Sequence, residues 1–142
     1  MLLPVKKLDP KAQLPTRAHD TDAGFDLYSP IGVNISVGAT VTIPTKLAIS
    51  LPENTVGLIY PRSSLGTKHG IVLANTVGVI DSGYRGEIML VVTNHGDRPY
   101  TIHTGDRVAQ LIVTPYYAPN VIEVADLEAS DRGTGGFGST GA

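Results

Sequence analysis

One short stretch places an acid and a phenol in a glycine-rich turn between two apolar runs. Residues 78–88 read GVIDSGYRGEI, with Asp81 three positions before Tyr84. Gly83 and Gly86 permit backbone conformations that other residues resist. A carboxylate held at such a turn can act as a general base on water, a contribution of roughly 10²–10⁴-fold. The commoner alternative is an Asx-turn, in which Asp81 only bonds its own backbone.

A second segment has the residue types of an anion site. Residues 61–66 read PRSSLG, so Ser63 and Ser64 stand where a short helix is expected to begin. Hydroxyls and free backbone N–H groups at a helix start can bind an anion, and Arg62 adds a fork of donors. A plain capped helix is the alternative, because serine is a common N-cap.

Two further polar patterns are weaker when taken alone. Asp22 and Asp26 flank a glycine in DAGFDL, which is typical of a turn that enters a strand. The run GDRVAQ puts Arg107 and Gln110 on an otherwise apolar strand. Arg107 paired to a carboxylate would be structural, and Gln110 needs a hydrogen-bond partner if it is buried.

The segment from Ala129 to Ala142 reads ASDRGTGGFGSTGA and contains nothing that could build a core. A flexible tail is the structural interpretation. The match to G-x-G-x-x-G does not indicate a dinucleotide site, because no strand precedes it. A mobile anion clamp is the functional interpretation, with Arg132 for charge and Phe137 for stacking. Base–aromatic stacking contributes about 1–3 kcal/mol.

These segments must be positioned by short strands. The 142 residues include sixteen Gly, ten Pro and no Trp, which favours strands and turns over long helices within a single domain. Only SSLGTKH, before Gly70, looks helical. Residues 78–88 are predicted to form a hairpin, and Pro44 is predicted to lie in a turn. Alternating or apolar runs predict strands at 41–43, 47–51, 56–60, 71–73, 88–93 and 108–113. An all-β sandwich or barrel is expected.

Composition excludes several classes of function. The net charge of −2, without a block of like charges, argues against binding of nucleic acid. The absence of cysteine excludes disulfides and thiolate metal sites, and the four histidines show no ligand spacing. No signal peptide or membrane span is recognisable. We therefore expect a soluble, cytoplasmic protein with no membrane partner.

Five motifs, in this order, resemble those of the trimeric dUTPases (deoxyuridine triphosphate nucleotidohydrolases). They are DAGFDL, PRSSLG, NTVGVIDSGYRGEI, GDRVAQLIV and RGTGGFGSTG, and they run from residue 22 to residue 141. The resemblance implies a small jelly-roll-type β-barrel (a dUTPase-like β-clip) over residues 1–128. It also implies a flexible Gly-rich C-terminal tail over residues 129–142 that closes over a neighbouring subunit's site, in a homotrimer with shared active sites.

The reaction implied by the resemblance is hydrolysis of dUTP to dUMP and pyrophosphate, through attack of water on the α-phosphorus. It would keep uracil out of DNA and supply dUMP for dTMP synthesis. Asp81 would activate the water, and Tyr84 would pack under the deoxyribose and exclude a 2′-hydroxyl. Mg²⁺ would be held mainly by the substrate phosphates. Asp26 would act on the metal indirectly, through water, with Arg107 bracing it.

The same resemblance assigns the remaining contacts to dUTP. Uracil would pair with Asn75 and with the backbone of Gly78, Val79 and Ile80, and Met89 is a further substrate contact. Ser64 stands where many members of the family have Gly, and its backbone N–H keeps the role. The phosphate and tail contacts would be Arg62, Ser63, Ser64, Gln110, Arg132, Gly138, Ser139 and Thr140, with Phe137 over uracil.

Two other functions remain open. The dCTP deaminases share the barrel and an RSS-type segment, but Val91 stands where their catalytic Glu would lie, and valine cannot move protons. A module that senses nucleotides or binds a partner, without useful turnover, is the second alternative. If the chain is phage-encoded, a regulatory protein partner is possible.

Overall fold

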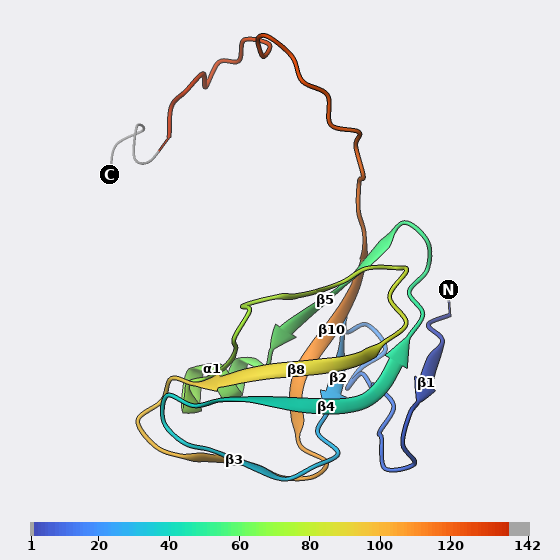
Figure 1. The fold of residues 1–142 in the computed structure, drawn as a ribbon, viewed down its shortest axis with the longest axis vertical. Coiled ribbons are helices and arrows are strands. Elements are labelled where there is room, and N and C mark those ends of the chain that lie inside the picture. Colours follow the sequence, from blue (N-terminus) through green and yellow to red (C-terminus); the bar gives the residue numbers. More distant parts are fainter. Residues whose placement is uncertain (1, 137–142) are drawn as a thin grey trace.

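The structure, a computed structural model, describes residues 2–136, and its regular elements are antiparallel strands and one short helix (Figure 1). Two four-stranded sheets cross each other, and a two-stranded pair lies at one end. The first sheet has the order β1 (Val5–Lys7), β4 (Thr40–Ile49), β8 (Glu87–Asn94), β6 (Ile71–Leu73). The second has the order β2 (Gly24–Tyr28), β10 (Arg107–Pro115), β5 (Thr55–Pro61), β7 (Gly78–Ile80). The pair is β3 (Val33–Ile35) and β9 (Tyr100–Ile102).

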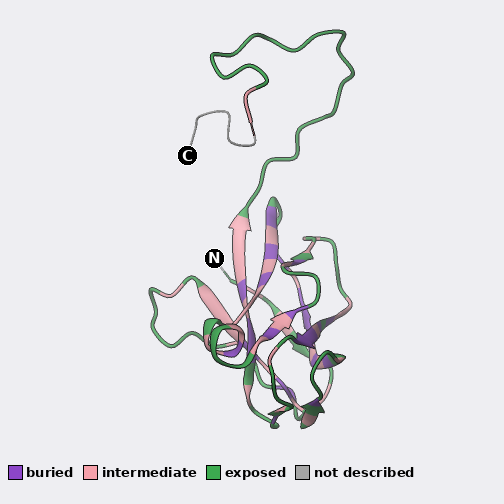
Figure 2. Ribbon diagram, turned by 90° about the vertical axis from the view of Figure 1, so that its left-hand side faces the viewer, coloured by how far each residue is buried: buried purple, intermediate pink, exposed green. Residues whose placement is uncertain are grey.

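The core lies between the sheets because alternate residues of the long strands point the same way. In β5 the buried and half-buried positions alternate, as the sequence predicts. Figure 2 shows buried segments on strands of both sheets. Side chains with almost no exposed surface include Leu27, Ile35, Ile43, Leu90, Ile102 and Leu111. The prediction of an all-β fold is confirmed.

The prediction of a turn at Pro44 is wrong. Pro44 lies inside β4, opposite Met89 of β8, and the register shifts between Pro44 and Ala48. A proline cannot donate to the ladder, so strands tolerate it at edges and bulges. Lys46, in the shifted segment, has a φ of 58°. The bulge therefore lets one strand span the two runs that the sequence separates.

The hairpin prediction for residues 78–88 is also wrong. β7 pairs with β5 in one sheet, while β8 pairs with β4 and β6 in the other. The turn between them therefore crosses from sheet to sheet. Both arms are apolar, and an apolar run does not specify its partner strand. The consequence is that β7, at the edge of its sheet, has no strand partner on its outer side among residues 2–136.

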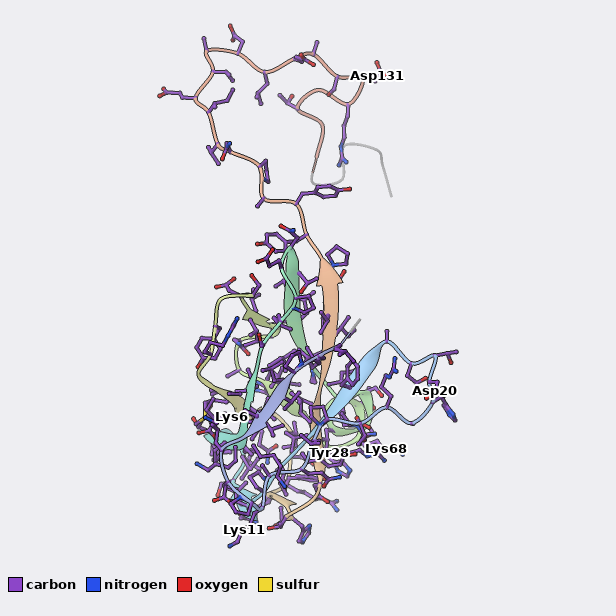
Figure 3. All side chains as sticks on the ribbon, turned by 90° about the vertical axis from the view of Figure 1, so that its right-hand side faces the viewer. Lys6, Lys11, Asp20, Tyr28, Lys68 and Asp131 are labelled. Carbon is purple, nitrogen blue, oxygen red and sulfur yellow. The ribbon has the colours of Figure 1, made fainter. Side chains whose placement is uncertain are left out.

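The predicted short helix is present as α1 (Ser63–His69), and it ends at Gly70 in the left-handed conformation with a φ of 67°. Among residues 2–136, no helix is long and apolar enough to cross a membrane. After β10, an exposed segment projects away from the strands (Figure 2). Asp131 on this segment is far from Lys68 and Tyr28 in Figure 3.

Candidate active site

The sheet-crossing turn borders a hollow of about 240 Å³, which we call the turn hollow. It combines two acids, Asp81 and Glu87, with an exposed apolar surface: Val79, Tyr84 and Met89 are 63%, 44% and 46% exposed. The residues that line it are Val79, Ile80, Asp81, Tyr84, Glu87 and Met89. The structure therefore brings together five of the residues expected to bind dUTP.

The carboxylate of Asp81 is exposed, and no hydrogen bond or ion pair engages it among residues 2–136. The turn is closed by the main chain instead, because the Tyr84 N–H donates to the Asp81 carbonyl oxygen at 3.0 Å. Among residues 2–136, the Asp81 side chain therefore does not form the Asx-turn that the sequence left as an alternative. The acid is left available for water.

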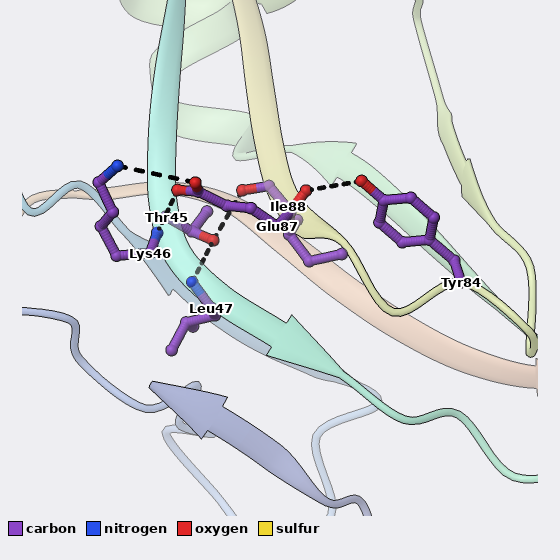
Figure 4. A network of polar contacts seen from close by, with 6 residues as sticks. All are labelled: Thr45, Lys46, Leu47, Tyr84, Glu87 and Ile88. Carbon is purple, nitrogen blue, oxygen red and sulfur yellow. Dashed lines mark hydrogen bonds and ion pairs between the residues drawn. The ribbon is translucent and has the colours of Figure 1, made fainter. Parts of the chain in front are cut away.

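The ring of Tyr84 is held by its own turn. Its hydroxyl donates to the Glu87 carbonyl oxygen at 3.0 Å, as Figure 4 shows. A Cβ on Gly86 would lie 2.3 Å from the Tyr84 Oη, so only glycine allows the ring this position. Arg85 donates to the carbonyl oxygens of Ser82 at 2.6 Å and Tyr84 at 2.8 Å. The turn is therefore rigid and Arg85 braces it.

The residues expected to read the base lie next to the free edge of β7. Gly78 is buried, and a Cβ there would lie 3.2 Å from the Cβ of Ile59 and 3.6 Å from the Asn75 Nδ2. Thr76 has a φ of 65°, which a β-branched residue rarely adopts. The outer side of a strand presents unpaired N–H and C=O groups. A ligand with an edge of donors and acceptors could pair with it.

A second hollow of about 400 Å³, the arginine hollow, is lined by Asp26, Arg62, Ser63, Arg107 and Gln110 among other residues. Its charges are organised around Asp26. One carboxylate oxygen is 3.2 Å from the Arg62 Nε, and the other is 3.1 Å from the Arg107 Nη1. The side chain of Asp26 is only 16% exposed, so the ion pairs are partly shielded from solvent.

Gln110, half-buried on an otherwise apolar strand, has a hydrogen-bond partner. Its Nε2 donates to the Pro61 carbonyl oxygen at 3.4 Å, and a Cβ on Gly24 would lie 2.6 Å from its Oε1. Ser63 is exposed at the start of α1. No side chain caps that helix and its first turn has no acid. Ser64 faces the adjoining hollow, which Arg62 and Arg107 also line.

The two hollows are distant within one chain. Gly57 of β5 faces Ile80 of β7, and the two strands are antiparallel. From this pair, Arg62 lies five residues further along the chain in one direction, and Asp81 lies one residue further in the opposite direction. At about 3.3 Å per residue, these six residues place Arg62 and Asp81 about 20 Å apart. Arg132 lies on the projecting segment, where its Nε donates to the Gly135 carbonyl oxygen at 3.0 Å. Phe137, Gly138, Ser139 and Thr140 are outside the described residues.

Residues 2–136 contain no group of three His, Cys, Asp or Glu side chains that could enclose a metal ion. The Asp26 carboxylate is engaged by two arginines rather than free. Because Mg²⁺ keeps several waters and often binds through substrate phosphates, a protein cage is not required. The residues present fit an ion that arrives with a triphosphate.

Comparison with known proteins identifies the family. The sequence matches the family model described as dUTPase over residues 10–141. The chain belongs to the dUTPase family. It is 47% identical over 139 residues to the deoxyuridine 5′-triphosphate nucleotidohydrolase of Clostridioides difficile, covering 98% of this chain and 97% of the relative. It is 46% identical to the Clostridium tetani protein of that name, covering 98% and 96%.

Solved dUTPase structures have the same fold. The Staphylococcus bacteriophage 80alpha dUTPase with dUPNHPP superposes with a TM-score of 0.93 at 32% identity and covers 99% of both chains. A mutant dUTPase of the S. aureus phage phi11, at 30% identity and a TM-score of 0.84, covers 91% of this chain and 100% of its own. That structure is described as showing the coordination of a structural Mg(II) ion.

Sequence reasoning missed two features of this dUTPase. The pairing of Arg62 with Asp26 was not anticipated, because the residues are far apart in the sequence and Arg62 was assigned to the phosphates and Asp26 to the metal. Glu87 was not singled out, although it lines the turn hollow. Its position directly after the turn glycine is the one signal in the sequence that could have drawn attention to it.

Proposed function

We propose that this dUTPase hydrolyses dUTP to dUMP and pyrophosphate, with the nucleoside in the turn hollow and Asp81 as the general base. The observation that carries the proposal is the exposed Asp81 carboxylate, free of partners among residues 2–136, beside a tyrosine fixed by its own turn. Family membership supports the choice of substrate. The reaction would keep uracil out of DNA and supply dUMP for dTMP synthesis.

In the proposed reaction, Asp81 removes a proton from a water molecule, and the water oxygen forms a bond to the α-phosphorus. The bond between that phosphorus and the oxygen bridging to the β-phosphorus breaks. The electron pair leaves with pyrophosphate. A positioned general base contributes roughly 10²–10⁴-fold, so the remaining acceleration must come from binding and from stabilisation of the developing charge.

Selection of the nucleoside follows from the turn hollow. The outer edge of β7 at Gly78, Val79 and Ile80 would pair with the edge of uracil, together with Asn75. A wrong base would leave those polar groups unpaired, and such mismatches discriminate strongly. Tyr84 would pack under the deoxyribose and would leave no room for a 2′-hydroxyl, and Met89 would contact the nucleoside.

The phosphates would lie in the arginine hollow. Arg62, Ser63, Ser64 and Gln110 would contact them, and Arg107 would keep Asp26 in place. A Mg²⁺ ion bound to the phosphates and to water would neutralise charge, with Asp26 reaching it through water. The tail would add Arg132, Phe137, Gly138, Ser139 and Thr140.

We propose that each active site is shared between copies of the chain in a homotrimer. Two observations support this: the hollows are about 20 Å apart in one chain, and the segment after β10 exposes apolar side chains. Tyr117, Val121 and Leu127 are 98%, 97% and 88% exposed. The jelly-roll barrel over residues 1–128, the closing tail at 129–142 and a cytoplasmic location are parts of the same proposal.

A panel of nucleotides tests the activity. Pyrophosphate release is measured with dUTP, dTTP, UTP and dCTP, with Mg²⁺ and with a chelator. We expect release from dUTP alone, and slower release with the chelator. Equal rates with dTTP would contradict the proposed base recognition, and ammonia released from dCTP would indicate a deaminase instead.

Shared sites are tested by co-expressing Asp81→Asn and Arg62→Ala chains. Each variant alone has one damaged half in every site. Random mixing gives about a quarter of the sites two intact halves, so activity should rise far above the sum of the separate variants. If a site is formed within one chain, mixing restores nothing.

A regulatory partner is a further possibility that the relatives raise. The Staphylococcus bacteriophage 80alpha dUTPase is described as one of the phage dUTPases that control transfer of virulence genes. A pull-down with this chain, with and without dUTP, tests whether it also has a partner protein.

A further inference from the structure

Glu87 joins two bonded networks at the start of β8 (Figure 4). Its Oε1 accepts a hydrogen bond from the Lys46 N–H at 2.9 Å, and its Oε2 is 3.6 Å from the Lys46 Nζ. Its main-chain oxygen accepts from the Tyr84 hydroxyl at 3.0 Å. The carboxylate therefore holds the β4 bulge, while the carbonyl holds the candidate sugar-binding ring.

The bulge requires support, because Lys46 adopts a left-handed conformation that side-chain-bearing residues disfavour. Thr45 provides part of it: its hydroxyl donates to the Ile88 carbonyl oxygen at 2.7 Å and accepts from the Leu47 N–H at 3.2 Å. The Glu87 carboxylate provides the rest by satisfying the Lys46 N–H. Without that acceptor, the main chain at Lys46 is free to leave the strained conformation.

Movement of the bulge would be transmitted to Tyr84. Ala48, just after the bulge, is paired with Glu87 across the sheet. The Glu87 carbonyl is the acceptor for the Tyr84 hydroxyl, and the ring lies where a Cβ on residue 86 would clash with it. A shift at the start of β8 therefore changes where the ring lies in the turn hollow.

We infer that Glu87 is a positioning residue for sugar selection, which acts through the Lys46 bulge and the Tyr84 hydroxyl. The inference rests on the proposed function, in which Tyr84 excludes a 2′-hydroxyl. The side chain of Glu87 is 24% exposed, and both of its carboxylate oxygens contact Lys46, so the inferred route to the substrate runs through these neighbours.

Three substitutions at Glu87 test whether its effect depends on the hydrogen bond that its side chain accepts from the Lys46 N–H or on its negative charge. Glu87→Ala removes the acceptor, and Glu87→Asp keeps the charge but withdraws it by one methylene. In both, the ratio of kcat/KM for dUTP to that for UTP should fall about tenfold, since small misplacements in a site have large effects. Glu87→Gln keeps an oxygen for the Lys46 N–H and should retain the parent ratio within about twofold. The inference would be overturned if the dUTP/UTP ratio were unchanged in Glu87→Asp, or if it fell about tenfold in Glu87→Gln.

Lys46→Gly is the matched control on the other side of the contact. Glycine adopts a φ of 58° without strain and keeps the N–H that Glu87 accepts. The dUTP/UTP ratio should therefore stay at the parent value although the ion pair is lost. A tenfold loss here would show that the ammonium group, not the backbone bond, sets the ring, and the inference would fail.

NMR of protein with ¹³C-labelled tyrosine gives a readout that does not depend on turnover. Tyr84→Phe assigns the Tyr84 ring signal among the six tyrosines. The signal should move in Glu87→Ala and Glu87→Asp and remain in place in Glu87→Gln. If it moves as expected while the parent protein does not hydrolyse dUTP, the proposed function fails and the coupling stands. If the signal is the same in all variants, the positioning role is wrong.

Discussion

The turn hollow and the arginine hollow are organised in different ways. In the turn hollow, main-chain and glycine contacts fix the groups, and the carboxylate of Asp81 has no partner among residues 2–136. In the arginine hollow, the charges hold one another, because Asp26 bridges Arg62 and Arg107. A site that selects a rigid base and sugar benefits from fixed geometry. A site for a flexible triphosphate can use charges that exchange partners when the ligand arrives.

The largest expected effect is at the reacting group. Asp81→Asn keeps the size of the side chain but cannot accept the proton, so kcat for dUTP should fall about 10²–10⁴-fold. Binding of dUTP, measured by calorimetry, should change little. Hydrolysis at the parent rate would show that Asp81 is not the base.

The rigidity of the turn is tested by a pair of glycines. A Cβ on Gly86 would lie 2.3 Å from the Tyr84 Oη, whereas a Cβ on Gly83 meets nothing within 4 Å. Gly86→Ala should displace the ring, with a roughly tenfold loss in the ratio of kcat/KM for dUTP to that for UTP. Gly83→Ala should match the parent protein, and equal effects at both positions would mean that the Tyr84 contact is irrelevant.

A substitution in the arginine hollow should change the binding of dUTP more than the rate of the chemical step. Asp26→Asn removes the charge between Arg62 and Arg107, so the two guanidinium groups lose their common orientation. We expect KM for dUTP to rise roughly tenfold, which corresponds to about 1.4 kcal/mol, with a smaller change in kcat. Asp97→Asn, at an exposed position, is the control. A fall in kcat with KM unchanged would place Asp26 at the chemistry instead.

The smallest expected effect is a difference between the two hollows in how strongly ligand binding depends on salt concentration. Raising NaCl from roughly 0.05 to 0.5 M shortens the Debye length and should weaken the arginine–phosphate contacts, which raises KM for dUTP a few-fold. Inhibition by deoxyuridine, which has no phosphate, should change much less. Equal salt dependence for both ligands would contradict the division of roles.

The longer strands could be predicted from the sequence because alternation over many residues is a strong signal. β5, β8 and β10 contain the expected runs, and β4 contains 41–43 and the first part of 47–51. Of the three-residue strands, β6 was predicted from its apolar run, whereas β1, β3 and β9 were not, since so short a segment shows no period and theirs include polar residues. The partner of β7 was mispredicted because its apolar residues fit either sheet.

The candidate site could be predicted only as far as local motifs extend. Asp81, Tyr84 and Met89 are close in the sequence, and they do line one hollow. The contact of Arg62 with Asp26 joins segments that are paired through β10, and no local pattern encodes it. The Lys46–Glu87 contact depends on a bulge, which arises from the register between two strands.

The outer position of β7 has a consequence for how this protein can change. If a base is read by peptide groups, the hydrogen bonds that choose it do not depend on the side chain of Val79, which contributes only apolar surface to the hollow. Substitutions on that strand would then drift without altering which nucleotide is accepted. A new preference would require a new path of the main chain, which single replacements seldom produce.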